Sequence, residues 1–309
     1  MAIDAWMRKA VLTIAGRRAV RSFFETYGMR LGVSRFVAAE RLEETLEVVL
    51  RLNRQGLMAT LDYLGESVTD RRLAAEAADT AIETLRRIRE RKLAANVSVK
   101  LTQLGLNIDP SFCEEQMRRI LDEAARTDNF VRIDMEDSSV TQATVDLFVK
   151  LLDVYGADRV GLVLQSYLYR SKEDRDRLGE RKANLRIVKG AYKEPKSIAY
   201  PSKKDVDRSY LRLVEDHMLQ GLYTAVATHD ERIIDSVVRF VEAHGVPKER
   251  FEFQMLYGIA TSLQFRLVQQ GYRVRVYTPF GEAWYPYFTR RIAERPANLW
   301  FVVKGLFRA

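Results

Sequence analysis

The sequence contains a single cysteine, Cys113, among its 309 residues, so no internal disulfide bond can form. This scarcity is typical of proteins in a reducing compartment. Only three histidines occur, His217, His229 and His244, and none lies in a close cluster with the cysteine. Because structural zinc sites need such clusters, we expect no bound metal.

The sequence also lacks the run of about 18 apolar residues that a membrane-spanning helix requires. Its amino terminus includes Asp4 and mixed charge, unlike a signal peptide. Lys and Arg outnumber Asp and Glu by 50 to 42, but the two signs are interspersed and no nucleic-acid recognition module is visible. We therefore expect a cytoplasmic protein without a nucleic-acid partner, and its basic surface leaves open a peripheral contact with the inner face of the cell membrane.

No Gly-x-Gly-x-x-Gly motif follows any apolar run, and no phosphate-loop signature occurs. Both absences argue against a Rossmann-type nucleotide domain. Any large cofactor must then be held by a different architecture.

Eight short apolar runs alternate with amphipathic stretches along the chain. This alternation predicts βαβ units and a parallel sheet. Eight such units over about 250 residues fit an α/β fold of the closed (β/α)₈ type, a TIM barrel. We predict a barrel catalytic domain at 57–309. The runs cover residues 57–63, 96–101, 130–135, 159–165, 185–189, 224–228, 251–256 and 273–277.

Residues 1–56 precede the repeat and read as a helical extension packed on the barrel. Within 3–21, apolar residues recur at helical spacing among several basic ones. Packing against the outside or bottom of the barrel is one interpretation, and contact with a membrane surface is the other. Residues 192–201 contain two prolines and predict a long loop.

Polar residues crowd the carboxyl ends of the expected strands, where TIM-barrel enzymes place catalytic groups. Ionisable groups inside a barrel need either a ligand or an internal ion-pair network. A helix after the last strand adds more polar groups. The candidates are Glu66, Lys100, Asp134, Glu136, Gln165, Arg186, Lys189, Thr228, His229, Gln254, Tyr277, Tyr287, Arg290, Arg291 and Glu294.

Two features indicate the chemistry of the ligand. The adjacent Arg290 and Arg291 present forked guanidinium groups that suit a carboxylate or phosphate, unless they belong to a solvated helix face. Gly190 and Ala191 follow Lys189, and small residues there would let a flat or phosphorylated ligand approach the backbone.

Two rival functions remain open from the residues alone. One is a lyase or aldolase that uses Lys100 or Lys189 as a Schiff-base amine. The other is a membrane-bound binding module without activity, which would require the whole ionisable set to be vestigial.

Seven segments, in order over nearly all of residues 57–298, carry a more specific signal: NVSVKLTQLG, FVRIDMEDS, GLVLQSYLYR, LRIVKGAYKEP, ATHDERII, FEFQMLYG and YTPFGEAWYPYFTRR. Together they resemble the flavin-dependent proline dehydrogenase family in its short, monofunctional bacterial form. The resemblance implies oxidation of L-proline to 1-pyrroline-5-carboxylate, the first step of proline catabolism to glutamate. It also implies hydride transfer to FAD and a membrane quinone as the final electron acceptor.

The resemblance further implies a role for each candidate. Asp134 and Arg186 would be catalytic, with Asp134 anchoring Lys100 and Arg186 favouring negative charge on the reduced isoalloxazine. Glu66 would correspond to the family's gate residue, which pairs with Arg290 when substrate binding closes the pocket. The substrate-binding set would be Lys100, Leu256, Tyr277, Tyr287, Arg290, Arg291 and Glu294. The FAD-binding set would be Met135, Gln165, Val188, Lys189, Gly190, Ala191, Tyr192, Thr228, His229 and Gln254.

Two of these assignments have an alternative: another tyrosine for the ring-packing role, and a structural role for His229. Tyr287 is preferred to Tyr285 as the ring-packing residue because it keeps the family's spacing to the first arginine. A lone histidine in a strand–helix turn, as at His229, can also be merely a cap or a core partner.

Overall fold

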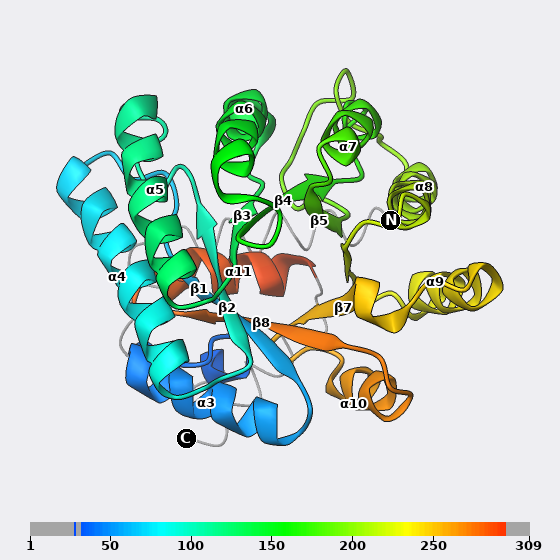
Figure 1. Cartoon of the computed structure of the whole chain (residues 1–309), viewed down its shortest axis with the longest axis horizontal. Coiled ribbons are helices and arrows are strands. Elements are labelled where there is room, and N and C mark those ends of the chain that lie inside the picture. Colours follow the sequence, from blue (N-terminus) through cyan, green and yellow to red (C-terminus); the bar gives the residue numbers. More distant parts are fainter. Residues whose placement is uncertain (1–27, 29–31, 295–309) are drawn as a thin grey trace.

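The computed structural model describes residue 28 and residues 32–294, and its strands form one closed, parallel barrel in sequence order. The predicted (β/α)₈ barrel is thereby confirmed. Figure 1 shows the helices arranged around the strands. The strands are β1 (Met58–Tyr63), β2 (Ala95–Lys100), β3 (Val131–Asp134), β4 (Val160–Gln165), β5 (Asn184–Val188), β6 (Thr224–Ala227), β7 (Phe251–Leu256) and β8 (Val274–Phe280).

Most strand ends lie within a residue or two of the predicted ones, but β8 is an exception. It continues to Phe280, because β1 pairs with it over its whole length up to the Tyr63–Phe280 pair. Tyr277 therefore lies inside β8, opposite Leu256 of β7, and the prediction that the strand ends there was wrong.

The strands alternate between an apolar outer face and a polar inner face. In β2, for example, Val97 and Val99 join the main hydrophobic core, whereas Ser98 lies on the opposite face. Hydrogen bonds from β5 and β8 to Asp134 of β3 join strands that are not neighbours, so these side chains cross the barrel interior. The alternation has the two-residue period expected for strands buried under helices.

Helices follow the strands and bury their apolar sides against the barrel. Asp70, Asp109 and Asp137 each accept a backbone hydrogen bond at the start of α4, α5 and α6, as good N-cap residues do. The helices around the barrel are α4 (Arg71–Glu90), α5 (Pro110–Arg126), α6 (Ser138–Tyr155), α7 (Ser171–Glu180), α8 (Lys203–Leu219), α9 (Glu231–His244), η2 (Lys248–Arg250), α10 (Thr261–Gln269) and α11 (Trp284–Glu294).

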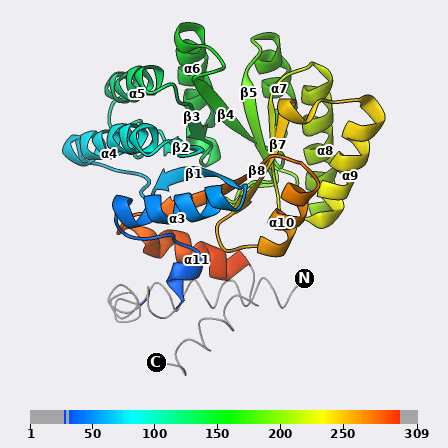
Figure 2. The same cartoon turned by 60° about the horizontal axis from the view of Figure 1, so that its bottom comes forward.

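Two described elements precede the barrel, η1 (Val33–Arg35) and α3 (Leu42–Arg54). Helix α3 lies against β1 and β8, so this part of the predicted extension does pack on the barrel (Figure 1). Figure 2 shows η1 beside α11. Residues next to η1 share a small apolar cluster with α11, in which Phe36 contacts Phe288. The helix expected within residues 3–21 lies outside the described residues.

The long loop predicted at 192–201 is confirmed, because no helix or named strand occurs between Val188 at the end of β5 and Lys203 at the start of α8. Over the described part of the chain, no helix has both the length and the apolar character that crossing a membrane requires.

Candidate active site

A cavity of about 960 Å³ lies at the carboxyl ends of the strands. Its size is at the upper end of the range for sites that hold organic ligands and cofactors. Every residue assigned a role from the sequence lines this cavity except Glu294, whose side chain lies outside the described part of the chain. The structure therefore brings the predicted set together at one site, although the individual roles stay predictions.

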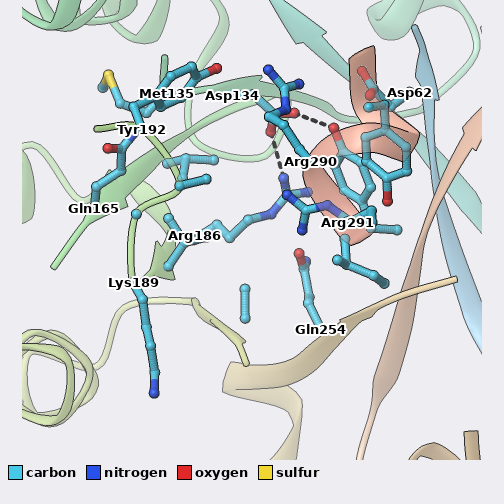
Figure 3. Close-up of a pocket in the computed structure, with 18 of the residues that line it drawn as sticks. Asp62, Asp134, Met135, Gln165, Arg186, Lys189, Tyr192, Gln254, Arg290 and Arg291 are labelled. Carbon is cyan, nitrogen blue, oxygen red and sulfur yellow. Dashed lines mark hydrogen bonds and ion pairs between the residues drawn. The ribbon is translucent and has the colours of Figure 1, made fainter. Parts of the chain in front are cut away.

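Asp134 is the centre of a buried hydrogen-bond network. Its Oδ1 accepts from Nη1 of Arg186 at 2.6 Å (Figure 3) and from Oγ of Ser98 at 2.7 Å, and its Oδ2 accepts from the Tyr277 hydroxyl at 2.6 Å. Burial by itself raises the pKa of a carboxyl, but Arg186 and Lys100 outweigh it and hold the pKa of Asp134 below its usual value. Asp134 is thus an anion that fixes Arg186 and Tyr277 in place.

Lys100 has a closer partner than the expected one. Its Nζ lies 2.8 Å and 3.0 Å from the two carboxylate oxygens of Asp62, and 3.8 Å from Asp134. Asp134 is therefore not the main anchor of Lys100. Sequence reasoning missed Asp62, although a carboxylate two residues after Thr60 in an otherwise apolar strand is a detectable signal.

The two carboxylates beside Lys100 differ in their acidity. Burial and the nearby Asp134 raise the pKa of Asp62, and Lys100 only partly offsets this. Lys100 itself is stabilised as a cation, because the attraction of Asp62 and Asp134 exceeds the effect of burial and raises its pKa.

The two arginines of α11 face the cavity. Arg290 donates a 2.7 Å hydrogen bond to Glu66, which follows β1, so the pair joins α11 to the segment after β1 at the cavity. The guanidinium of Arg291 lies 5.3 Å from the centre of the Tyr287 ring. These contacts exclude the solvated-face interpretation. Tyr285 and Tyr287 are both buried in the cluster with Trp284, but only Tyr287 of the two lines the cavity, which supports the choice of Tyr287.

The end of the cavity away from Arg291 is formed by Met135, Gln165 and Tyr192, with Arg186 between this end and Arg291 in Figure 3. Nε2 of Gln165 donates to the backbone oxygen of Glu136 at 2.8 Å. The carboxylate of Glu136 binds Thr102 and is absent from the lining, so its expected place among the site residues was wrong.

Glycine is required at position 190 for a reason other than the expected approach of a ligand. Its φ is +112°, and a Cβ there would overlap the Tyr167 ring. Close packing against Tyr167 and a left-handed backbone therefore require glycine, whatever ligand approaches.

Both candidate Schiff-base lysines are held in ion pairs. Lys189 lies 2.6 Å from Asp207 and 3.0 Å from Asp230, and in Figure 3 its side chain points away from the other labelled residues. A Schiff-base lysine must be a neutral amine, and the carboxylates beside Lys100 disfavour that form by raising its pKa.

His229 lines the cavity and also has a structural contact. Its Nε2 accepts a 2.8 Å hydrogen bond from the backbone N–H of Leu256, so the ring ties the turn after β6 to the end of β7. Thr228 Oγ1 accepts from the backbone of Asp230, and Gln254 donates to Glu252. This part of the wall is therefore held by its own hydrogen bonds.

Comparison with known proteins agrees with this geometry. A family described as "Proline dehydrogenase" matches residues 45–304. The chain is 46% identical over 309 residues to a proline dehydrogenase of Deinococcus radiodurans, with 99% of each chain covered. It is 42% identical over 302 residues to proline dehydrogenase 1 of Bacillus subtilis strain 168, covering 98% of this chain and 99% of the relative.

A solved structure supports the same relationship. Proline utilization A from Bdellovibrio bacteriovorus, inactivated by N-propargylglycine, superposes with a TM-score of 0.79 at 26% identity. The match covers 86% of this chain and 32% of that much longer one. The resemblance seen in the seven sequence segments is confirmed, and the chain belongs to the proline dehydrogenase family.

Proposed function

We propose that this enzyme oxidises L-proline to 1-pyrroline-5-carboxylate by hydride transfer to a bound FAD. The observation that carries the proposal is that the two ends of one cavity differ in their chemistry. Arg291 lies at one end, near Asp62 and its partner Lys100, and Met135 and Gln165 lie at the other, with Arg290 over the Tyr192 ring between them.

The residues present fit a flavin. The buried Oε1 of Gln165 and the buried Nε and Nη2 of Arg186 have no hydrogen-bond partner within the described residues. Buried polar atoms without partners are costly, and a flat heteroaromatic ring with donors and acceptors would satisfy them. Residues that would hold the flavin are Met135, Gln165, Val188, Lys189, Gly190, Ala191, Tyr192, Thr228, His229 and Gln254.

No protein side chain accepts a hydride, and a bound flavin supplies that two-electron acceptor. Arg186 is a buried cation whose position is fixed by Asp134 at 2.6 Å. A fixed positive charge beside the ring would favour negative charge that develops during reduction. This is the role we assign to Arg186, with Asp134 orienting it.

Substrate binding would use the opposite end of the cavity. Arg290, Arg291 and Lys100 would bind the carboxylate, since guanidinium groups form paired, charge-assisted hydrogen bonds with it. Tyr277, Tyr287 and Leu256 would pack on the ring, and Glu294 would lie behind the arginines. The Glu66–Arg290 pair would act as the gate that closes over the substrate and excludes water.

The proposal extends to the electron acceptor and the domains. Turnover requires reoxidation of the reduced flavin, and we propose a membrane quinone as the electron acceptor. The reaction would be the first step of proline catabolism to glutamate. A peripheral contact with the inner face of the cell membrane would allow this transfer, and a net charge of +8 would favour binding to anionic lipid.

We further propose that residues 1–56 are the helical extension and that residues 57–309 are the catalytic domain.

An absorption spectrum of the purified protein tests the proposal. We expect a non-covalent flavin with a band near about 450 nm that L-proline bleaches without oxygen. A colourless protein that stays inactive after reconstitution with FAD would contradict it. Trapping of substrate on a lysine by borohydride, again without a yellow cofactor, would instead favour the Schiff-base function.

A further inference from the structure

The loop between β5 and α8 contributes Gly190, Ala191 and Tyr192 to the cavity wall. Because residues 189–202 form no helix or named strand, side-chain and backbone contacts must hold the loop in place. The position of this wall therefore depends on a few identifiable contacts.

The second half of the loop is held against the segment after β4. Ala199 forms an isolated bridge with Leu168, and the backbone N–H of Tyr200 donates to Tyr167 at 2.8 Å. The Tyr169 hydroxyl donates to the backbone oxygen of Lys196 at 2.9 Å. These contacts fix residues 196–200, but they do not reach Tyr192.

A separate contact holds the loop just beyond Tyr192. The two carboxylate oxygens of Glu194 accept hydrogen bonds from Ser138, one from its backbone N–H at 2.8 Å and one from its Oγ at 2.6 Å. Ser138 is the first residue of α6 and follows the end of β3, where Met135 lines the same cavity. A carboxylate at a helix N-terminus is also favoured by the helix dipole.

We propose that Glu194 is a positioning residue for the cavity wall. Its two-point contact with Ser138 ties the segment carrying Tyr192 to the segment carrying Met135. Tyr192 in turn lies beneath Arg290, whose guanidinium is 6.0 Å from the centre of the tyrosine ring. The contact thus sets the wall that faces the substrate-binding arginine, and this consequence rests on the proposed function.

The chain offers a way to break the contact from either side. Glu194→Ala removes both acceptors. Ser138→Pro removes both donors at the first helical position, where proline is favourable. The preceding Asp137 has φ −70° and ψ 170°, an extended conformation compatible with a following proline, and its own cap on Ser139 at 2.9 Å remains. Helix α6 should therefore fold in this variant.

Two measurements test the proposal on the full chain. Backbone hydrogen exchange over residues 190–195, followed by mass spectrometry, measures how firmly this part of the loop is held, and the KM for L-proline measures the effect on the substrate site. We expect each single variant to speed exchange and raise KM by about fivefold, the effect of a lost hydrogen bond, with little change in kcat. The double variant should equal either single one, because both changes remove the same contact.

Ser139→Ala is the matched control, since Ser139 is exposed in the same helical turn and its Oγ binds Asp137 instead. It should leave both measurements unchanged. Additive effects in the double variant, faster exchange with an unchanged KM, or no effect in either variant would each overturn the proposal. If the protein does not oxidise proline, hydrogen exchange alone still shows whether the contact holds the loop, so the two failures can be distinguished.

Discussion

Lys100 and Asp62 form a close ion pair inside the barrel, with 2.8 Å and 3.0 Å between the lysine Nζ and the two carboxylate oxygens. They lie on adjacent strands, and the side chain of Asp62 is only 1% exposed. Asp134 is 3.8 Å away on the other side of the lysine. Lys100 is therefore the close cation of Asp62 and adds to the charge of Arg186 beside Asp134.

Replacing Lys100 by Met should destabilise the fold strongly. It leaves Asp62 and Asp134 buried without this cation, and breaking a buried pair in this way costs about 3–5 kcal/mol. Urea unfolding at neutral pH measures the change. The double variant Lys100→Met with Asp62→Asn should recover part of the loss, whereas Lys150→Met on the surface should change stability by less than about 0.5 kcal/mol. A Lys100→Met variant as stable as the native protein would show that the pair contributes little.

Replacing Arg291 by Met should raise the KM for L-proline steeply. A buried carboxylate loses a charge-assisted partner, which corresponds to roughly 30- to 1,000-fold. The flavin should stay bound, because Arg291 lies at the opposite end of the cavity from Gln165 (Figure 3). Steady-state kinetics with an artificial electron acceptor measure the effect, and Arg266→Met, at an exposed side chain of α10, is the control. Unchanged affinity for proline and for carboxylate inhibitors would mean that the substrate site is elsewhere.

Tyr277 should determine the choice between L-proline and trans-4-hydroxy-L-proline. If the carboxylate is held by the arginines, the far edge of the ring meets the tyrosine, and a hydroxyl there would be desolvated or clash. We expect at least about a tenfold preference for proline in specificity constant. Tyr277→Ser should narrow this preference, chiefly by weakening proline binding. Equal specificity constants in the native enzyme, or unchanged discrimination in the variant, would argue against this contact.

His217 should make the stability of the fold sensitive to acid. It is fully buried, its Nδ1 lies 2.8 Å from Thr224 Oγ1, and burial lowers its pKa to about 4 from the ordinary 6.5. The unfolded chain therefore binds a proton that the folded protein does not between pH 6.5 and 4. The contribution of neutral His217 to the free energy of unfolding is fully present above pH 6.5. It falls by about 3 kcal/mol as the pH drops to 4.

Unfolding of the His217→Gln variant across this pH range checks the assignment. The variant should be less stable at neutral pH because it loses buried contacts, but it should lack this acid-dependent loss. His244→Gln removes an exposed histidine and should retain the loss. The same acid slope in native protein and the His217 variant would show that other groups cause it.

The sequence by itself determined the architecture and the location of the site. The alternation of apolar and polar residues along each run specifies which side chains face the helices and which face the barrel axis. Since parallel strands of a barrel present their carboxyl ends on one side, polar residues at those ends had to converge. This is why the sequence alone assigns residues as distant as Lys100 and Gln254 to one cavity.

Tertiary structure alone decided the partners within that cavity. Strand periodicity says that Asp62, Lys100 and Asp134 all point inward. The strand register places Lys100 opposite Asp134 and Asp62 opposite Ser98, yet Lys100 lies closer to Asp62, while Asp134 binds Arg186 and Tyr277. Pairing with β1 also extends β8 to Phe280. The requirement for glycine at position 190 depends on the Tyr167 ring beside it, and the contact of Glu194 with Ser138 joins residues 56 positions apart. Such contacts follow from how the strands close into a barrel, which no local pattern of residues encodes.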